Sequence, residues 1–145
     1  MKKAVVLVVE EKALIRMESA DIVRDAGFTA LEAANADDAV SILAGRRDIR
    51  IVLVDITISG TMDGLSLAHA IRNRWPTVHL IVTAALNAME HGQLPENAHF
   101  IRKPYSFEQV TAALCELRSH YRPRIRGVSR RYQSWQFLPE LAPPK

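Results

Sequence analysis

Five residues able to do chemistry lie where short apolar runs of the sequence end. Glu10 and Glu11 follow AVVLVV, Asp55 follows IRIVLV, Thr83 closes VHLIVT, and Lys103 follows HFIR. Carboxylates brought close together repel one another, and burial strengthens the repulsion, so such a cluster normally binds a hard cation. Oxygen ligands favour Mg²⁺, and no Cys/His set has the spacing of zinc ligands. A lysine ammonium and a threonine hydroxyl at the same point would contact a phosphoryl group carried by Asp55.

Each of these residues also has a structural interpretation. Asp55 could cap a turn, Glu10 and Glu11 could be a solvated strand end, Thr83 is a good strand former, and Lys103 could be a surface charge. Taken singly, every residue except Asp55 favours that interpretation. The combination favours a site that holds a phosphoryl group on Asp55.

Strand-like and helix-like segments alternate through the first 120 residues. The apolar, β-rich runs cover residues 4–9, 28–33, 49–54, 78–83 and 99–102. Helical spacing lies between and after them, with a weak fourth segment near 86–92. The apolar positions expected on the helices are Leu14, Ile15, Ile22 and Val23; Ala39, Ile42 and Leu43; Leu67, Ala70 and Ile71; and Phe107, Val110, Leu114 and Leu117.

The sequence predicts where two of the helices start. Asn35 followed by Asp38, and Ser106 followed by Gln109, have the spacing of an N-cap with a partner three residues later. Strands alternating with helices predict right-handed crossovers and a parallel sheet covered on both faces. The first, third and fourth strands are the most apolar and are expected in the middle. Ligands of such sheets bind beyond the carboxyl ends of the strands. The five candidate site residues named above lie at these ends.

Four segments of the sequence resemble the receiver domain of two-component response regulators. They are VLVVEEKALIR, IVLVDITISGTMDGLSLA, IVTAALN and FIRKPYS, in the family's order, over roughly residues 3–119. The expected fold class is therefore α/β, a doubly wound five-stranded parallel sheet in the flavodoxin-like order 2-1-3-4-5 with helices on both faces. Residues 1–120 are expected to form the receiver domain, and 121–145 a basic, aromatic-containing tail.

The resemblance also implies roles for individual residues. Asp55 would take a phosphoryl group from the phosphohistidine of a histidine kinase, and Lys103 would pair with that group. Mg²⁺ would be the cofactor. Its implied ligands are Glu10, Glu11, Asp55 and the backbone carbonyl of Thr57. Thr83 would hydrogen-bond the phosphoryl group in a switch linked to Phe100.

Two departures from the family pattern keep an alternative open. Glu11 stands where the family usually has aspartate, and Ser59 where it often has proline. A receiver-like protein-binding module that does not depend on phosphorylation is therefore the second hypothesis. An enzyme is not expected beyond self-phosphorylation and autodephosphorylation on Asp55. Phosphatases of the haloacid dehalogenase type need a second aspartate two residues after the first, and Thr57 stands there.

The C-terminal segment is strongly basic, and it bears on which partners the protein is expected to have. Residues 121–145 carry six basic residues against one acidic residue, with aromatic residues between them. A mobile arm, or an arm folded back with its aromatic residues on the body, is favoured over contact with nucleic acid or an acidic partner, because four prolines discourage a helix. No dedicated DNA-binding domain is expected, so the chain resembles a stand-alone receiver. Its expected partners are a sensor histidine kinase or a histidine phosphotransfer protein, and a downstream protein bound through segments 86–92, 99–102 and 107–119. A homodimer is also compatible with the sequence.

The remaining features predict a cytoplasmic protein with no membrane insertion. Lys2 and Lys3 precede an apolar run, but Glu10 ends that run before it reaches the length of a signal peptide. A lone Cys115 cannot form an internal disulfide.

Overall fold

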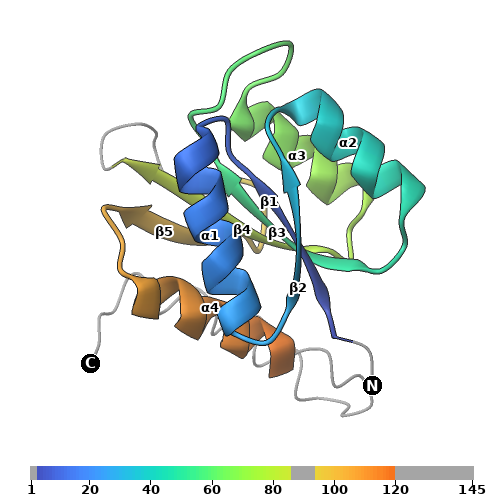
Figure 1. Ribbon diagram of the computed structural model, residues 1–145. Helices are drawn as coiled ribbons and strands as arrows, with labels where there is room; N and C mark the ends of the chain where they lie inside the picture. Colours follow the sequence, from blue (N-terminus) through green and yellow to red (C-terminus); the bar gives the residue numbers. More distant parts are fainter. Residues whose placement is uncertain (1–2, 86–93, 120–145) are drawn as a thin grey trace.

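The computed structural model describes residues 3–85 and 94–119. Strands and helices alternate along this part of the chain, as the sequence predicts (Figure 1). The elements are β1 (Val5–Val9), α1 (Ala13–Asp25), β2 (Thr29–Ala33), α2 (Ala36–Gly45), β3 (Ile49–Asp55), α3 (Gly64–Arg74), β4 (His79–Ala85), β5 (His99–Lys103) and α4 (Phe107–Ser119).

The strands form one parallel sheet in the order β2-β1-β3-β4-β5, which confirms the predicted fold class. The central strands β1 and β3 are buried along nearly their whole length, whereas the edge strand β2 is half exposed. A strand covered on both faces must be apolar at successive positions, which is why the runs VVLVV and IVLV belong in the middle.

Helices cover both faces of the sheet, α2 and α3 on one side and α1 and α4 on the other (Figure 1). Alternate strand residues therefore enter two separate cores. Leu7, Val52 and Val82 face the core with α2 and α3. Val8 and Leu53 face the core with α1 and α4.

Hydrogen bonds of the chain confirm both predicted helix starts. The side chain of Asn35 accepts from the amide of Asp38 at 2.8 Å. Ser106 and Gln109 form a reciprocal pair, in which Gln109 N donates to Ser106 Oγ at 3.0 Å and Ser106 N donates to Gln109 Oε1 at 2.8 Å. These bonds satisfy amides that have no partner within the first turn of a helix.

Two of the predicted apolar helix positions are wrong. Leu14 is 69% exposed and Phe107 is 47% exposed. Both lie in the first turn of a helix that begins beyond the carboxyl end of a strand, where the helix has not yet crossed onto the sheet. The small residues Ser19 and Ala20 pack instead in the middle of α1.

Two predictions concern residues outside the described ranges. The weak helix near 86–92 falls in the gap between β4 and β5, and the tail at 121–145 follows the last described residue. Within residues 3–85 and 94–119, no helix is long and apolar enough to cross a bilayer.

Candidate functional site

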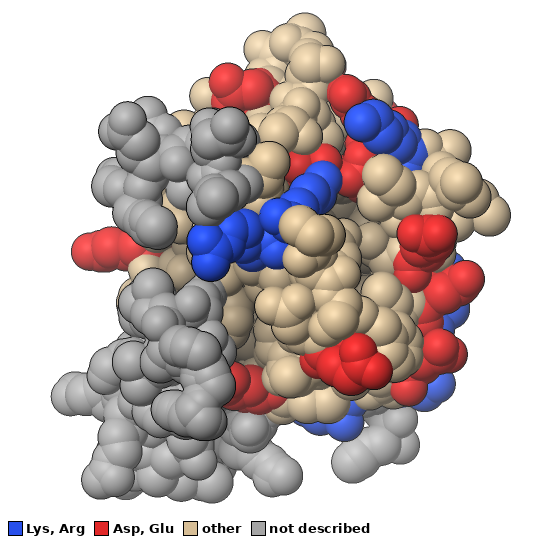
Figure 2. All heavy atoms as spheres, turned by 90° about the vertical axis from the view of Figure 1, so that its left-hand side faces the viewer, with Lys and Arg blue, Asp and Glu red and all other residues tan. Residues whose placement is uncertain are grey.

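Four of the predicted site residues lie at one edge of the sheet and share one face. Asp55 is the last residue of β3 and pairs in register with Thr83 of β4. Lys103 ends β5, and Glu10 directly follows β1, whose Val9 pairs with Val54. Because side chains alternate along a strand, all four point toward the α1 and α4 side. Figure 2, which looks onto the side where β4 and β5 end, shows basic atoms lying against a small group of acidic atoms.

Asp55 is held by hydrogen bonds on both oxygens. Lys103 Nζ lies 3.0 Å from Oδ2. Oδ1 accepts from the amide of Thr57 at 3.0 Å and from its hydroxyl at 2.9 Å. Asp55 is only 6% exposed, so this carboxylate has exchanged most of its water for protein donors. Its side chain is thereby fixed in direction before any ligand arrives.

The carboxyls of Glu10 and Asp55 share a hydrogen bond and affect each other's ionisation. Burial of Glu10 raises its pKa, and the hydrogen bond and charge of Asp55 add to this. Burial alone would also raise the pKa of Asp55, but hydrogen bonds from Thr57, Glu10 and Lys103 outweigh it and lower that pKa. Asp55 is therefore the carboxyl of the pair that loses its proton more readily, as a nucleophile must.

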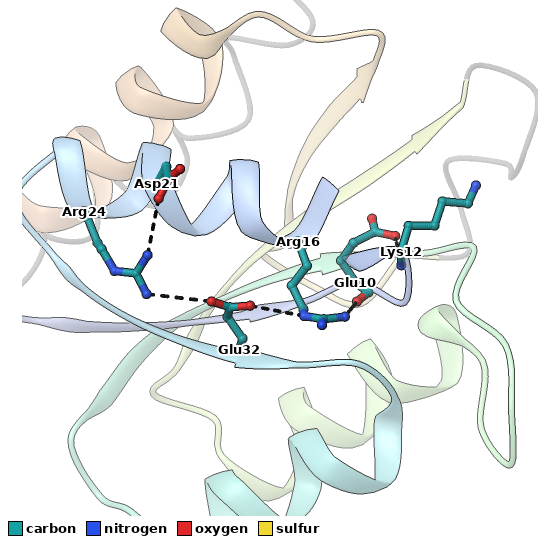
Figure 3. Close-up of polar contacts among 6 residues, drawn as sticks. All are labelled: Glu10, Lys12, Arg16, Asp21, Arg24 and Glu32. Carbon is teal, nitrogen blue, oxygen red and sulfur yellow. Dashed lines mark hydrogen bonds and ion pairs between the residues drawn. The ribbon is translucent and has the colours of Figure 1, made fainter. Parts of the chain in front are cut away.

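A polar network along α1 supports Glu10 (Figure 3). The amide of Lys12 donates to Glu10 Oε2 at 3.0 Å, and Arg16 Nη1 donates to the Glu10 carbonyl at 2.9 Å. Arg16 Nε also pairs with Glu32 of β2 at 3.2 Å, and Arg24 approaches the other oxygen of Glu32 at 3.7 Å. Arg16 thus joins the end of β1 to its neighbouring strand.

The predicted metal ligand Glu11 points to a different partner. Its Oε1 accepts from the amide and from the hydroxyl of Ser59, both at 3.1 Å. Glu11 is exposed, whereas Glu10 is buried. Across residues 3–85 and 94–119, no three Asp, Glu, His or Cys side chains are grouped so that they could hold one metal ion. The structure therefore brings Glu10, Asp55, Thr83 and Lys103 together, and Glu11 is bonded instead to Ser59, between β3 and α3.

The oxygen ligands at the site suit Mg²⁺ even without Glu11. This ion needs only one or two protein carboxylates when phosphate and water oxygens complete its coordination. Glu10 and Asp55 supply two adjacent carboxyls, and burial disfavours the charged form of each, a cost that a cation would reduce. Thr57 follows two residues after Asp55 and carries the predicted carbonyl ligand.

The two predicted switch residues lie on opposite faces of the sheet. Thr83 is 3% exposed and directly beside Asp55 in register. Phe100 of β5 pairs in register with Val82 and packs, half buried, against the α2 and α3 core. Any coupling between Thr83 and Phe100 must therefore pass through the sheet, and their role as a switch stays a prediction.

Sequence reasoning missed Gly64, which packs against the backbone at the end of β3. Asp63 caps α3 by accepting from the amide of Ser66 at 2.8 Å, and Gly64 begins the helix against the end of β3. A Cβ on Gly64 would lie 2.5 Å from the Asp55 carbonyl oxygen and equally close to two backbone atoms of Ile56. The Asp-Gly pair before an amphipathic segment was the available signal, since it combines a cap with a residue that has no side chain.

A doubly wound parallel sheet with two carboxyls, a hydroxyl and a lysine at its carboxyl edge carries these residues where α/β domains of this class bind ligands. The family model of the response regulator receiver domain matches residues 6–115. The chain belongs to this family, the receiver domains of two-component response regulators.

Similar proteins include an NtrX-like response regulator and the regulator NtrC. An NtrX-like response regulator of Rickettsia bellii is 31% identical over 131 residues, which is 83% of this chain and 26% of that protein. The DNA-binding transcriptional regulator NtrC of Salmonella typhimurium is 28% identical, over 83% of this chain and 26% of that protein. The chain thus spans about a quarter of the length of these relatives.

Solved structures agree on the fold. The receiver domain of NtrX from Brucella abortus has a TM-score of 0.71 and 27% identity, over 77% of this chain and 96% of that one. A CheY-like receiver domain from Methanospirillum hungatei has a TM-score of 0.72 at 20% identity, over 82% of this chain and 96% of that one.

Proposed function

We propose that the chain is a phosphoacceptor in a two-component phosphorelay, and that Asp55 takes a phosphoryl group from a histidine kinase or a histidine phosphotransfer protein. The observation that carries this proposal is the 3.0 Å bond between Lys103 Nζ and Asp55 Oδ2, with Thr83 beside Asp55 in register. A buried, ionised carboxylate next to a cation and a hydroxyl has the parts needed to receive and retain a phosphoryl group.

In the proposed transfer, an oxygen of Asp55 attacks the phosphorus of phosphohistidine. The new phosphorus–oxygen bond forms as the phosphorus–nitrogen bond breaks, and the imidazole nitrogen keeps the electron pair and takes up a proton. Lys103 then offers its hydrogen bond to a phosphoryl oxygen, and the Thr83 hydroxyl donates to another. The Thr57 amide keeps the Asp55 carboxyl oriented during the attack.

Glu10, Asp55 and the Thr57 carbonyl are the residues that would hold Mg²⁺, with Glu11 as a fourth ligand if it leaves Ser59. When bound there, the ion would supply positive charge to offset the repulsion between the carboxylates and the phosphoryl oxygens. Autodephosphorylation of Asp55 is the only further chemistry proposed.

Signal output is proposed to occur by protein contact or by onward phosphotransfer. β5 and α4, together with residues 86–92, form the expected surface for the downstream protein, and Phe100 lies in this region. Residues 1–120 are proposed as the receiver domain and 121–145 as a basic tail, with the cytoplasm as the expected location.

Phosphoramidate tests the phosphoacceptor role, because it carries the phosphorus–nitrogen bond of phosphohistidine. Purified protein incubated with this donor and Mg²⁺ should gain the mass of one phosphoryl group. Asp55→Asn should abolish the gain. Asp63→Asn is the matched control, since it removes a nearby carboxylate while asparagine still caps α3. A gain that persists in Asp55→Asn would refute the proposal.

Glu11 supports a second candidate, a receiver-like binding module that does not depend on phosphorylation. Its carboxylate is bonded to Ser59 rather than grouped with Glu10 and Asp55. Absence of any mass gain in the wild-type protein, with full folding, would favour this candidate.

A further inference from the structure

Successive residues of the β3–α3 loop, residues 56–63, make two kinds of contact, and the two kinds alternate along the chain. Ile56 and Ile58 are buried and point into the core shared with α2 and α3. Thr57 and Ser59 are exposed, and their donors reach carboxylates, Thr57 on Asp55 and Ser59 on Glu11. The loop that supplies a predicted metal ligand is therefore also bonded to the loop that follows β1.

Glutamate at position 11 makes this second attachment. Ser59 donates to one oxygen, Glu11 Oε1, through its amide and its hydroxyl at the same distance of 3.1 Å. Both residues are exposed, and 48 positions separate them in the sequence. Hydrogen bonds to a carboxylate are shorter and stronger than hydrogen bonds to a neutral acceptor.

We propose that Ser59 competes with the metal ion for Glu11 and thereby sets the Mg²⁺ affinity of the pocket. Ser59 is in this sense a positioning residue, since it acts through Glu11 and touches neither the phosphoryl group nor Asp55. When Glu11 turns to the ion, both bonds to Ser59 break, and the loop loses its link to the end of β1. The inference rests on the proposed function, because it takes Mg²⁺ as the cofactor of that site.

Removal of the Ser59 hydroxyl tests the competition directly. Ser59→Ala should tighten Mg²⁺ binding about fivefold, the value expected from losing one competing hydrogen bond of about 1 kcal/mol. Isothermal titration with MgCl₂ and no phosphoryl donor measures the affinity. Thr61→Ala is the matched control. It removes another hydroxyl of the same loop, one that donates to Asp37 at 3.0 Å, and should leave the affinity unchanged.

A double-mutant cycle shows whether the effect passes through Glu11. In the Glu11→Gln background, Ser59→Ala should no longer tighten binding. Amide exchange of Ser59 gives a second readout, and it should be faster at saturating Mg²⁺ than without the ion. Equal affinities of wild type and Ser59→Ala, the same gain in the Glu11→Gln background, or no Mg²⁺ binding by either protein would each overturn the inference.

These outcomes separate the inference from the proposed function. If Asp55 is phosphorylated but Ser59→Ala leaves Mg²⁺ affinity unchanged, only the role of Ser59 fails. If Ser59→Ala tightens Mg²⁺ binding but phosphoramidate gives no mass gain, only the phosphoacceptor role fails.

Discussion

Gly64 packs directly against the backbone of Asp55, so closely that a Cβ at position 64 would lie 2.5 Å from the Asp55 carbonyl oxygen. The neighbouring atoms are backbone and cannot rotate away. The first turn of α3 is therefore built against the end of the strand that carries Asp55. Asp63 fixes this turn through its bond to the Ser66 amide, which is the main reason that the pKa of Asp63 is lowered.

Gly64→Ala should destabilise the fold and impair the site together. Relief of the contact requires α3 or the end of β3 to shift, at a cost of about 1–3 kcal/mol in unfolding free energy. Urea unfolding measures this loss, and phosphorylation by phosphoramidate measures the effect on Asp55. Gly45→Ala is the control, because a Cβ there meets nothing within 4 Å at the end of α2. A Gly64→Ala protein as stable as Gly45→Ala would contradict the close contact.

Lys103→Met should raise the pKa of Asp55, because it removes one of the hydrogen bonds and the positive charge that lower it. The rate of phosphorylation by phosphoramidate should fall by about tenfold to a hundredfold, as expected when one preorganised charge at a reacting group is lost. The pKa is measured by carbon-13 NMR of the labelled Asp55 carboxyl. Arg102→Met removes the neighbouring charge on β5, which lies on the other face of the strand, and should change neither quantity. Unchanged Asp55 ionisation in Lys103→Met would contradict the assigned ion pair.

The sequence predicts the sheet better than it predicts the site. The apolar runs define all five strands, because buried central strands such as β3 must be continuously apolar. The convergence of Glu10, Asp55, Thr83 and Lys103 also follows from sequence, since carboxyl ends of parallel strands meet at one edge.

The partner of Glu11 could not be predicted from its residue type. The sequence around Glu11 is the same whether its carboxylate lies beside Asp55 or is bonded to Ser59. Which partner Glu11 takes depends on the path of the β3–α3 loop. Leu14 and Phe107 were misassigned for a related reason, because helical periodicity gives the face of a helix but not the point at which it reaches the sheet.

Arg16→Met should destabilise the fold more than removal of a closer but exposed ion pair. Arg16 is mostly buried, with its side chain 19% exposed, and bonds both Glu32 and the Glu10 carbonyl. Its loss should lower the unfolding free energy by about 1 kcal/mol, since the Glu10 carbonyl loses a charged donor in a partly buried position. Arg46→Met removes a shorter pair, 2.8 Å to Asp48, that is open to solvent. It should have no measurable effect in the same urea titration. Equal losses in the two variants would show that Arg16 contributes only as a surface charge.

His99 gives the fold a pH dependence of known sign. It begins β5, is 3% exposed, and burial lowers its pKa to about 4. The unfolded chain has the ordinary histidine pKa of about 6.5, so between these values it binds more protons than the folded chain. The unfolding free energy should therefore fall as the pH is lowered from about 6.5 to about 4, by up to about 3 kcal/mol. Glu10 and Glu116, whose pKa values are raised chiefly by burial, act in the opposite direction.

His99→Gln isolates the histidine contribution, because glutamine does not titrate. The variant should lose less stability than the wild type between pH 7 and pH 4.5 in urea titrations at each pH, whatever its stability at neutral pH. Parallel stability profiles for wild type and His99→Gln would mean that His99 takes up its proton without unfolding. The burial of β5 against β4 would then be looser than the sheet register indicates.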